Sequence, residues 1–223
     1  MTKAARQLPA ITRRSLTRMG AAGAGALLAG PLMPVMSWAA GAHPNPMPDE
    51  LRKVLERNPA LPVLGNPDGD VTLSEFFDYN CSFCRKNVAN VKTLIGKDPK
   101  LRVVFREWPV FGDGSFYAAR AALASLNQGK YWQLHTALMA TRGRVEEATV
   151  LRAARKVGLD MDRLKADMEK RAILDQIYET MDLADTMMLS GTPSFIAGHD
   201  ASFGFQSVGD LEAMVAQARK DLL

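Results

Sequence analysis

The sequence is poor in cysteine, because its 223 residues include two, Cys81 and Cys84, which form one Cys-x-x-Cys motif. A framework of several disulfides is therefore excluded, as is a zinc site built from two such motifs within one chain. Aromatic residues make up 7% of the chain and charged residues 23%, against 47% hydrophobic residues. This balance argues against a disordered or coiled-coil protein and is sufficient for a full hydrophobic core.

The body of the chain also lacks an excess of positive charge. The whole sequence has a formal net charge of +4, but five of its 28 Lys and Arg residues lie in the first 42 residues, which contain no acid. The rest of the chain therefore has 23 basic against 24 acidic side chains. Such a body has no surplus of cations with which to bind phosphates, and we expect no nucleic-acid partner.

The basic start has the pattern of an export signal. Arg13 and Arg14 precede an apolar, glycine-rich run over residues 19–36, and small residues follow it. The paired arginines resemble the bacterial twin-arginine export signal. Because Leu16 stands where that signal often has Phe, the general secretory route is an alternative.

A retained membrane anchor is the other interpretation of this segment. Pro31, Pro34 and several glycines make the apolar run a poor membrane-spanning helix. We therefore expect residues 1–39 to be cleaved after Ala39. The mature protein is then expected in the periplasm, an oxidising compartment in which a thiol pair can be turned over as a disulfide.

Hydrophobic patterning beyond the leader predicts an α/β protein. A proline-rich lead-in and a short helix occupy residues 40–68. The next elements are predicted as strand 71–78, helix 81–95, strand 101–108, helices 118–126, 131–140, 147–157, 161–168 and 175–188, strands 193–197 and 202–205, and helix 210–222. This order predicts an α/β fold with a helical insertion between its second and third strands.

The motif Cys81-Ser82-Phe83-Cys84 follows a predicted strand and opens a predicted helix. Cysteines three residues apart lie on one helix face, so their sulfurs can close a reversible disulfide. The helix dipole and the unpaired N–H groups favour a thiolate on Cys81, whereas Cys84 lies one turn further in. We expect Cys81 to react with the substrate and Cys84 to resolve the mixed disulfide. A structural disulfide and half of an intermolecular metal site are the alternatives.

Glu75 shares a predicted strand face with Leu73 and Phe77, six residues before Cys81. A carboxyl partly removed from water there would have a raised pKa, suited to proton transfer with Cys84 through water. The alternative is an acid at the end of the strand that reaches solvent.

Several motifs occur in a fixed order along the chain. They are Glu75-Phe76-Phe77-Asp78-Tyr79-Asn80 before the cysteines, residues 103–109, 118–123 and 128–132, and Gly191-Thr192-Pro193-Ser194-Phe195. This set is similar to the bacterial DsbA-like disulfide oxidoreductases of the thioredoxin superfamily, from about residue 69 to the C-terminus. The resemblance implies a thioredoxin fold over residues 69–223 with a helical insertion at about 112–190. It also implies disulfide chemistry without a bound cofactor or metal.

The resemblance assigns further roles around the cysteines. A cis Thr192–Pro193 bond is expected beside Cys81, where the Thr192 backbone can pair with an extended substrate chain. Ser82 and Phe83 are expected to contact substrate. Strong oxidants of the family carry Pro-His between the cysteines, so Ser82-Phe83, which cannot ionise, implies a less stabilised thiolate. Thr192 is similar to the residue of isomerase and reductase relatives, and Thr192→Val is expected to be a stronger oxidant.

The sequence thus predicts an exported, monomeric thiol–disulfide oxidoreductase. Its substrates would be cysteine-containing secreted proteins that are unfolded or still folding, and a membrane redox partner would recycle it. A disulfide isomerase or reductase kept reduced by a membrane partner is the alternative within this class. A non-catalytic holdase, or a metal-binding protein that uses the two thiolates, is the alternative outside it.

Overall fold

A computed structural model describes residues 45–223, and the predicted export signal at residues 1–39 lies outside the described residues. The elements in chain order are α1 (Asp49–Arg57), β1 (Val63–Gly65), β2 (Val71–Phe77), α2 (Ser82–Lys97), β3 (Leu101–Glu107), α3 (Asp113–Ser125), the 3-10 turn η1 (Leu126–Gln128), α4 (Tyr131–Met139), α5 (Glu147–Lys156), α6 (Met161–Met168), α7 (Arg171–Thr186), β4 (Ser194–Ala197), β5 (Asp200–Phe203) and α8 (Val208–Leu222). The helices α3 to α7 stand between β3 and β4, where the sequence predicts a helical block.

The described strands form one mixed sheet in the order β1-β3-β2-β4-β5. β2 and β3 are parallel and are joined through α2, whereas the other strand pairs are antiparallel. In the parallel pair, Glu75 is in register with Phe105, and Phe77 is in register with Glu107. Side chains in register project to the same side of a sheet, so these four side chains share one face.

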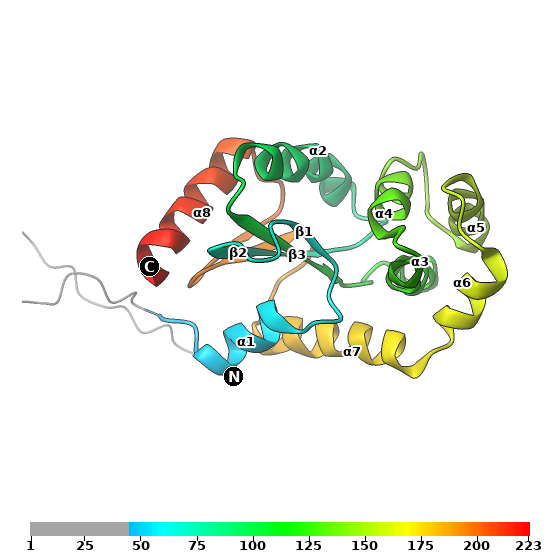
Figure 1. Cartoon of the computed structure of the whole chain (residues 1–223), viewed down its shortest axis with the longest axis horizontal. Coiled ribbons are helices and arrows are strands. Elements are labelled where there is room, and N and C mark those ends of the chain that lie inside the picture. The colour runs from blue at the N-terminus through cyan, green and yellow to red at the C-terminus, as the bar shows by residue number, and fades with distance from the viewer. Residues whose placement is uncertain (1–44) are drawn as a thin grey trace, which may run out of the picture. The chain divides into compact units, whose positions relative to one another are not determined.

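Helices cover both faces of the sheet (Figure 1). α2 and α8 lie on one face, α1 and α7 lie on the other, and α3 to α6 gather beside the sheet. Every residue of β2 and β3 is buried. Both faces of β2 are therefore buried, as is usual for central parallel strands, and residues that alternate along β2 lie on opposite buried faces.

Two buried arginines of β3 hold α1 against the sheet. Arg106 donates hydrogen bonds to the Leu55 carbonyl at 2.7 Å and to Glu179 of α7 at 3.1 Å. Arg102 donates to the Glu56 carbonyl at 2.6 Å. These carbonyls belong to the last turn of α1, which has no intrahelical donors for them. The helix predicted as part of the lead-in is thus packed into the core.

Some element boundaries differ from those that the sequence predicts. β1 was not predicted, because three residues are too few to show alternation. α3 begins five residues earlier than predicted, since tertiary packing accommodates the weak helix formers Gly114 and Ser115. A Cβ at Gly114 would collide with the Val145 carbonyl, so this glycine permits close contact between α3 and the loop before α5. α7 begins four residues earlier than predicted, and β5 lies two residues closer to the N-terminus.

Candidate active site

The two cysteines lie where β2 leads into α2. Cys81 is the N-cap residue of α2, and its Sγ accepts a hydrogen bond from the Cys84 N–H at 3.2 Å. Both residues are free thiols; Cys81 is 3% exposed and Cys84 is fully buried. A sulfur at the N-cap occupies the place of the usual capping oxygen, where negative charge is stabilised by the helix-start amides.

The surroundings move the pKa values of the two thiols in opposite directions. The pKa of Cys81 is lowered to about 6, chiefly by hydrogen bonding from the Cys84 side chain, although burial opposes this shift. Smaller contributions come from Thr192 and from the backbone of Cys84 and Phe83. Burial raises the pKa of Cys84 well above that of an ordinary cysteine. At neutral pH, Cys81 is therefore a thiolate and Cys84 keeps its proton.

The loop before β4 lies against Cys81. The Thr192–Pro193 peptide bond is cis, and the Cys81 Sγ lies 3.2 Å from the Thr192 carbonyl oxygen, to which it donates when it is protonated. The Thr192 hydroxyl is buried and makes no hydrogen bond of ordinary length and angle to the described residues. It nevertheless contributes to the lowered pKa of Cys81. The Pro193 carbonyl accepts the Gly204 N–H at 2.8 Å, which joins this loop to the end of β5.

Glu75 lies inside β2 and is 3% exposed. Burial first, and the neighbouring charge of Cys81 second, raise the pKa of Glu75 to about 8. The charge of Glu75 in turn contributes to the raised pKa of Cys84. This position does not fit an acid at a strand end that reaches solvent. A carboxyl with such a pKa can take up or release a proton near neutral pH.

The two residues between the buried cysteines are exposed. Ser82 and Phe83 are exposed on the first turn of α2, and the Phe83 side chain is 49% exposed. Phe111 and Phe205 are exposed in loops that adjoin residues hydrogen-bonded to the site. Beside Cys81, the surface thus offers the exposed Phe83 ring, with the Lys86 Nζ 5.4 Å from its centroid.

A polar clamp, which sequence reasoning did not identify, fixes the residues before Cys81. The Asp78 carboxylate accepts the Val110 N–H and the Ser115 hydroxyl, each at 2.7 Å. The Asn80 side chain accepts the Val145 N–H at 2.7 Å and donates to the Val145 carbonyl at 3.0 Å. Both bonds of Asn80 reach the loop between α4 and α5, so the helical block positions the active-site loop.

Arg85 extends this clamp from the second turn of α2. Its guanidinium donates to the Tyr79 carbonyl at 2.8 Å, and to the carbonyls of Thr141 at 3.1 Å and Gly143 at 2.8 Å. Polar residues directly after a wholly buried strand were the available signal in the sequence. The partners of these residues are distant in sequence: Gly143, for example, lies 58 residues from Arg85, and no local pattern indicates such a contact.

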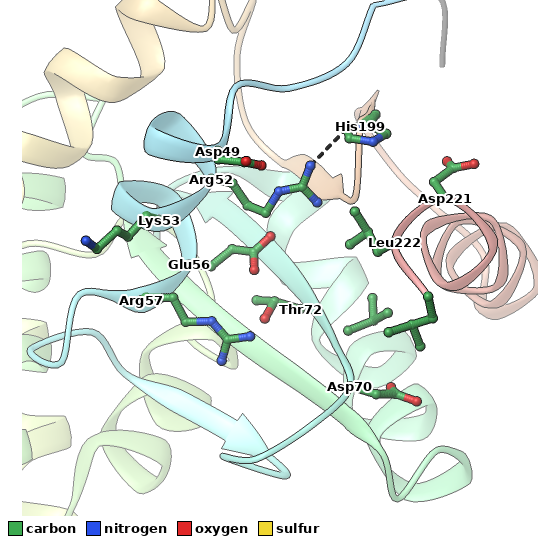
Figure 2. A pocket seen from close by; sticks show the side chains of 12 residues that line it. Asp49, Arg52, Lys53, Glu56, Arg57, Asp70, Thr72, His199, Asp221 and Leu222 are labelled. Carbon is green, nitrogen blue, oxygen red and sulfur yellow. Dashed lines mark hydrogen bonds between the residues drawn. The ribbon is translucent and has the colours of Figure 1, made fainter. Parts of the chain in front are cut away.

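Other chemistry-bearing groups lie apart from the cysteines. A cavity of about 550 Å³ is lined by the first residues of β2 and by α1, and neither cysteine lines it (Figure 2). In it, Arg52 lies 3.0 Å from the His199 Nδ1. Over residues 45–223, no group of three or more His, Cys, Asp or Glu could hold a metal ion. Within the same range, none of the helices combines the length and apolar character needed to cross a bilayer.

Residues 72–216, which contain both cysteines, Glu75 and Thr192-Pro193, match the family described as DSBA-like thioredoxin domain. The chain belongs to this family. The predicted family, the thioredoxin fold and the enzyme class of thiol–disulfide oxidoreductase are thereby confirmed.

Two solved structures agree with this membership, and a curated relative of another name shares part of its length with this chain. A thioredoxin-like oxidoreductase from Silicibacter pomeroyi DSS-3 is 48% identical, with a TM-score of 0.74, over 76% of this chain and 98% of that one. The thiol-disulfide exchange protein alpha-DsbA2 from Wolbachia pipientis is 26% identical, with a TM-score of 0.71, over 76% and 92% of the two chains. A Salinispora tropica protein named Na(+)/H(+) antiporter NhaA 3 is 30% identical over 70% of this chain, which spans 24% of that relative's length.

Proposed function

We propose that this protein is an exported oxidoreductase that exchanges disulfides with cysteine-containing secreted proteins through Cys81 and Cys84. The observation that carries the proposal is the contrast between a thiolate at the start of α2 and a shielded, protonated thiol one turn later. A low-pKa thiolate is a good leaving group, so the reduced form is favoured and the disulfide form is an oxidant. The exposed Phe83 ring near Cys81 suits unfolded chains better than small polar thiols.

The oxidising reaction moves two electrons from substrate to protein. A substrate thiolate attacks Sγ of Cys81, the Cys81–Cys84 bond breaks, and Cys84 leaves as a thiolate that takes a proton from Glu75. A second substrate thiolate then attacks the substrate sulfur of the mixed disulfide and releases Cys81 as a thiolate. The substrate gains one disulfide. A disulfide of a membrane partner accepts the two electrons and restores the Cys81–Cys84 bond.

The same steps run in reverse constitute the second candidate, an isomerase or reductase that a membrane partner keeps reduced. The presence of Thr192 before Pro193 favours it, since the family resemblance associates this residue with such relatives. The reduction potential of the pair separates the two candidates. An oxidase is expected near about −120 to −180 mV and a reductase near about −270 mV.

The compartment and organisation follow from the leader. Residues 1–39 are an export signal that is removed, by the twin-arginine or the general secretory route. Residues 40–68 and the thioredoxin-like segment 69–223, with its helical insertion at about 112–190, form a monomeric periplasmic protein. It needs no bound cofactor or metal, because the cysteine pair is the redox group.

A peptide with two cysteines tests the proposal. The protein in its disulfide form should oxidise the reduced peptide, and Cys84→Ser mixed with the disulfide form of the peptide should be trapped as a peptide adduct on Cys81, seen by mass spectrometry. The double variant Cys81→Ser/Cys84→Ser should form neither product. If the wild type gives no exchange, and the double variant suppresses aggregation of an unfolded protein as well as the wild type does, the holdase interpretation replaces this one.

A further inference from the structure

Glu107 is a second buried carboxyl at the sheet, and the mechanism above does not use it. It ends β3 and is 2% exposed. Its Oε1 accepts the hydroxyls of Tyr79 and Tyr131, both at 2.9 Å. The Tyr79 hydroxyl also lies 3.3 Å from Nδ1 of His135. One carboxyl, two phenols and one imidazole thus form a connected polar cluster inside the core.

The cluster lies on the same sheet face as Glu75. Glu75 is in register with Phe105, and Glu107 is in register with Phe77, so the two carboxyls are diagonal neighbours on parallel strands. Burial is the main cause of the raised pKa of Glu107, and the charges of Asp78 and Glu75 add to it. In the low-dielectric interior, two neighbouring carboxylates oppose each other's ionisation, and their protons are bound as a pair.

The groups that face Glu107 do not neutralise it. Tyr79 and Tyr131 are held in the protonated state because burial raises their pKa values, so they remain hydrogen-bond donors. Burial lowers the pKa of His135 to about 3, which leaves the imidazole of α4 uncharged. The other charged group acting on Glu107 besides Glu75 is the Asp78 carboxylate, which has the same sign. The two hydroxyls are therefore what supports a charge on Glu107.

We propose that Glu107, held by Tyr79 and Tyr131, is a positioning residue for disulfide exchange because its proton is shared in a coupled way with Glu75. When either carboxyl is ionised, the other holds its proton more tightly. The pair thereby sets the pH at which Glu75 takes a proton from Cys84 or returns it. This inference rests on the proposed function, in which Glu75 transfers that proton.

The test isolates the resolving step. Reduced protein reacts with a one-cysteine peptide activated by thionitrobenzoate, which leaves as its thiolate and places the peptide on Cys81. Cys84 then gives its proton to Glu75 and attacks Cys81, which releases the peptide thiol and closes the Cys81–Cys84 disulfide. The release rate is measured in single turnovers from pH 5 to 9. The titration of a single proton is nearly complete within about two pH units, and the wild-type release rate should rise over a wider interval than that.

Glu107→Gln should give a one-proton profile with its midpoint at least about one pH unit lower, because a neighbouring like charge is removed. The glutamine oxygen can still accept both hydroxyls. The matched control is Glu56→Gln: Glu56 is also buried, and burial also raises its pKa, but it belongs to α1 on the other sheet face. The profile of this control should superimpose on that of the wild type.

A Glu107→Gln profile with wild-type shape and midpoint overturns the proposal, even if all rates fall together as in a packing defect. If Glu107→Gln does not fold, Tyr131→Phe serves instead. It removes one donor to Glu107 and should also lower the midpoint of the release-rate profile. An unmoved midpoint in Tyr131→Phe would likewise overturn the proposal. Absence of exchange in the wild type refutes the proposed function itself, whereas normal exchange with unmoved profiles refutes this inference alone.

Discussion

Titration of the reduced protein provides a direct measure of the site that stabilises Cys81. With a pKa of about 6, against 9.0 for an ordinary cysteine, Cys81 is about ten-to-one ionised at pH 7. The folded-state pKa is below the unfolded one, so the thiolate stabilises the reduced fold above the unfolded pKa and loses this effect as pH falls through 6. At about 1.36 kcal/mol per pKa unit, the gain is about 1.4 kcal/mol at pH 7 and about 4 kcal/mol above pH 9.

Thiolate absorbance near about 240 nm and the rate of alkylation by iodoacetamide report the midpoint. Cys84→Ala removes the side-chain donor that contributes most to the low pKa of Cys81, so its midpoint should rise by at least about one unit. Cys84→Ser keeps a donor and should titrate close to the wild type, and Cys81→Ser gives the baseline. A wild-type midpoint above about 8, or equal midpoints in the two Cys84 variants, would refute the reasoning.

Substitutions at three further positions, Glu75, Thr192 and Arg85, have expected outcomes. Glu75→Gln should stabilise the protein by up to about 3 kcal/mol at pH 7, because a carboxyl whose pKa rises from 4.5 to about 8 must take up a proton to fold; the gain in denaturant melts should vanish below about pH 4.5. The same variant should slow resolution of mixed disulfides, and an unchanged single-turnover rate contradicts its role. Thr192→Val removes a hydroxyl that lowers the pKa of Cys81, so it should raise the Cys81 midpoint and make the protein a weaker oxidant in glutathione titrations, while Thr192→Ser should not. The family resemblance implies the opposite result for Thr192→Val, a stronger oxidant. Arg85→Met should cost about 1–3 kcal/mol in denaturant melts because it removes the donor to the part-buried Tyr79 carbonyl as well as the bond to Gly143, whereas Arg171→Met, at an exposed ion pair, should change little.

Local patterns predict those parts of the site that lie on regular elements. The strand before Cys81, the helix after it and the alternation of Glu75 with Leu73 and Phe77 were all visible in about 25 residues of sequence. The three-residue strand β1 was not, because it is defined by its pairing with β3 rather than by its own pattern.

The polar groups that complete the site depend on contacts between distant segments. Glu107 meets Tyr79 and Tyr131, which are 28 and 24 residues away, and the Asp78 carboxylate meets the Val110 N–H across 32 residues. An acid at the end of a strand is usually solvated, so the sequence pattern alone favours an exposed Glu107. Its burial follows from the way α4 packs beside the sheet, which is a property of the tertiary fold.

The residues between the cysteines do not by themselves decide how strongly the thiolate is stabilised. Ser82-Phe83 carries no ionisable group, and the family resemblance therefore implied a thiolate less stabilised than that of the strong oxidants. The low pKa of Cys81 instead comes from the Cys84 thiol, the Thr192 hydroxyl and the amides of the first turn of α2. These are fixed dipoles that do not titrate near neutral pH, unlike a histidine. The oxidising power of the pair should thus follow, in this pH range, the ionisation of Cys81 and of Glu75 with its coupled partner Glu107.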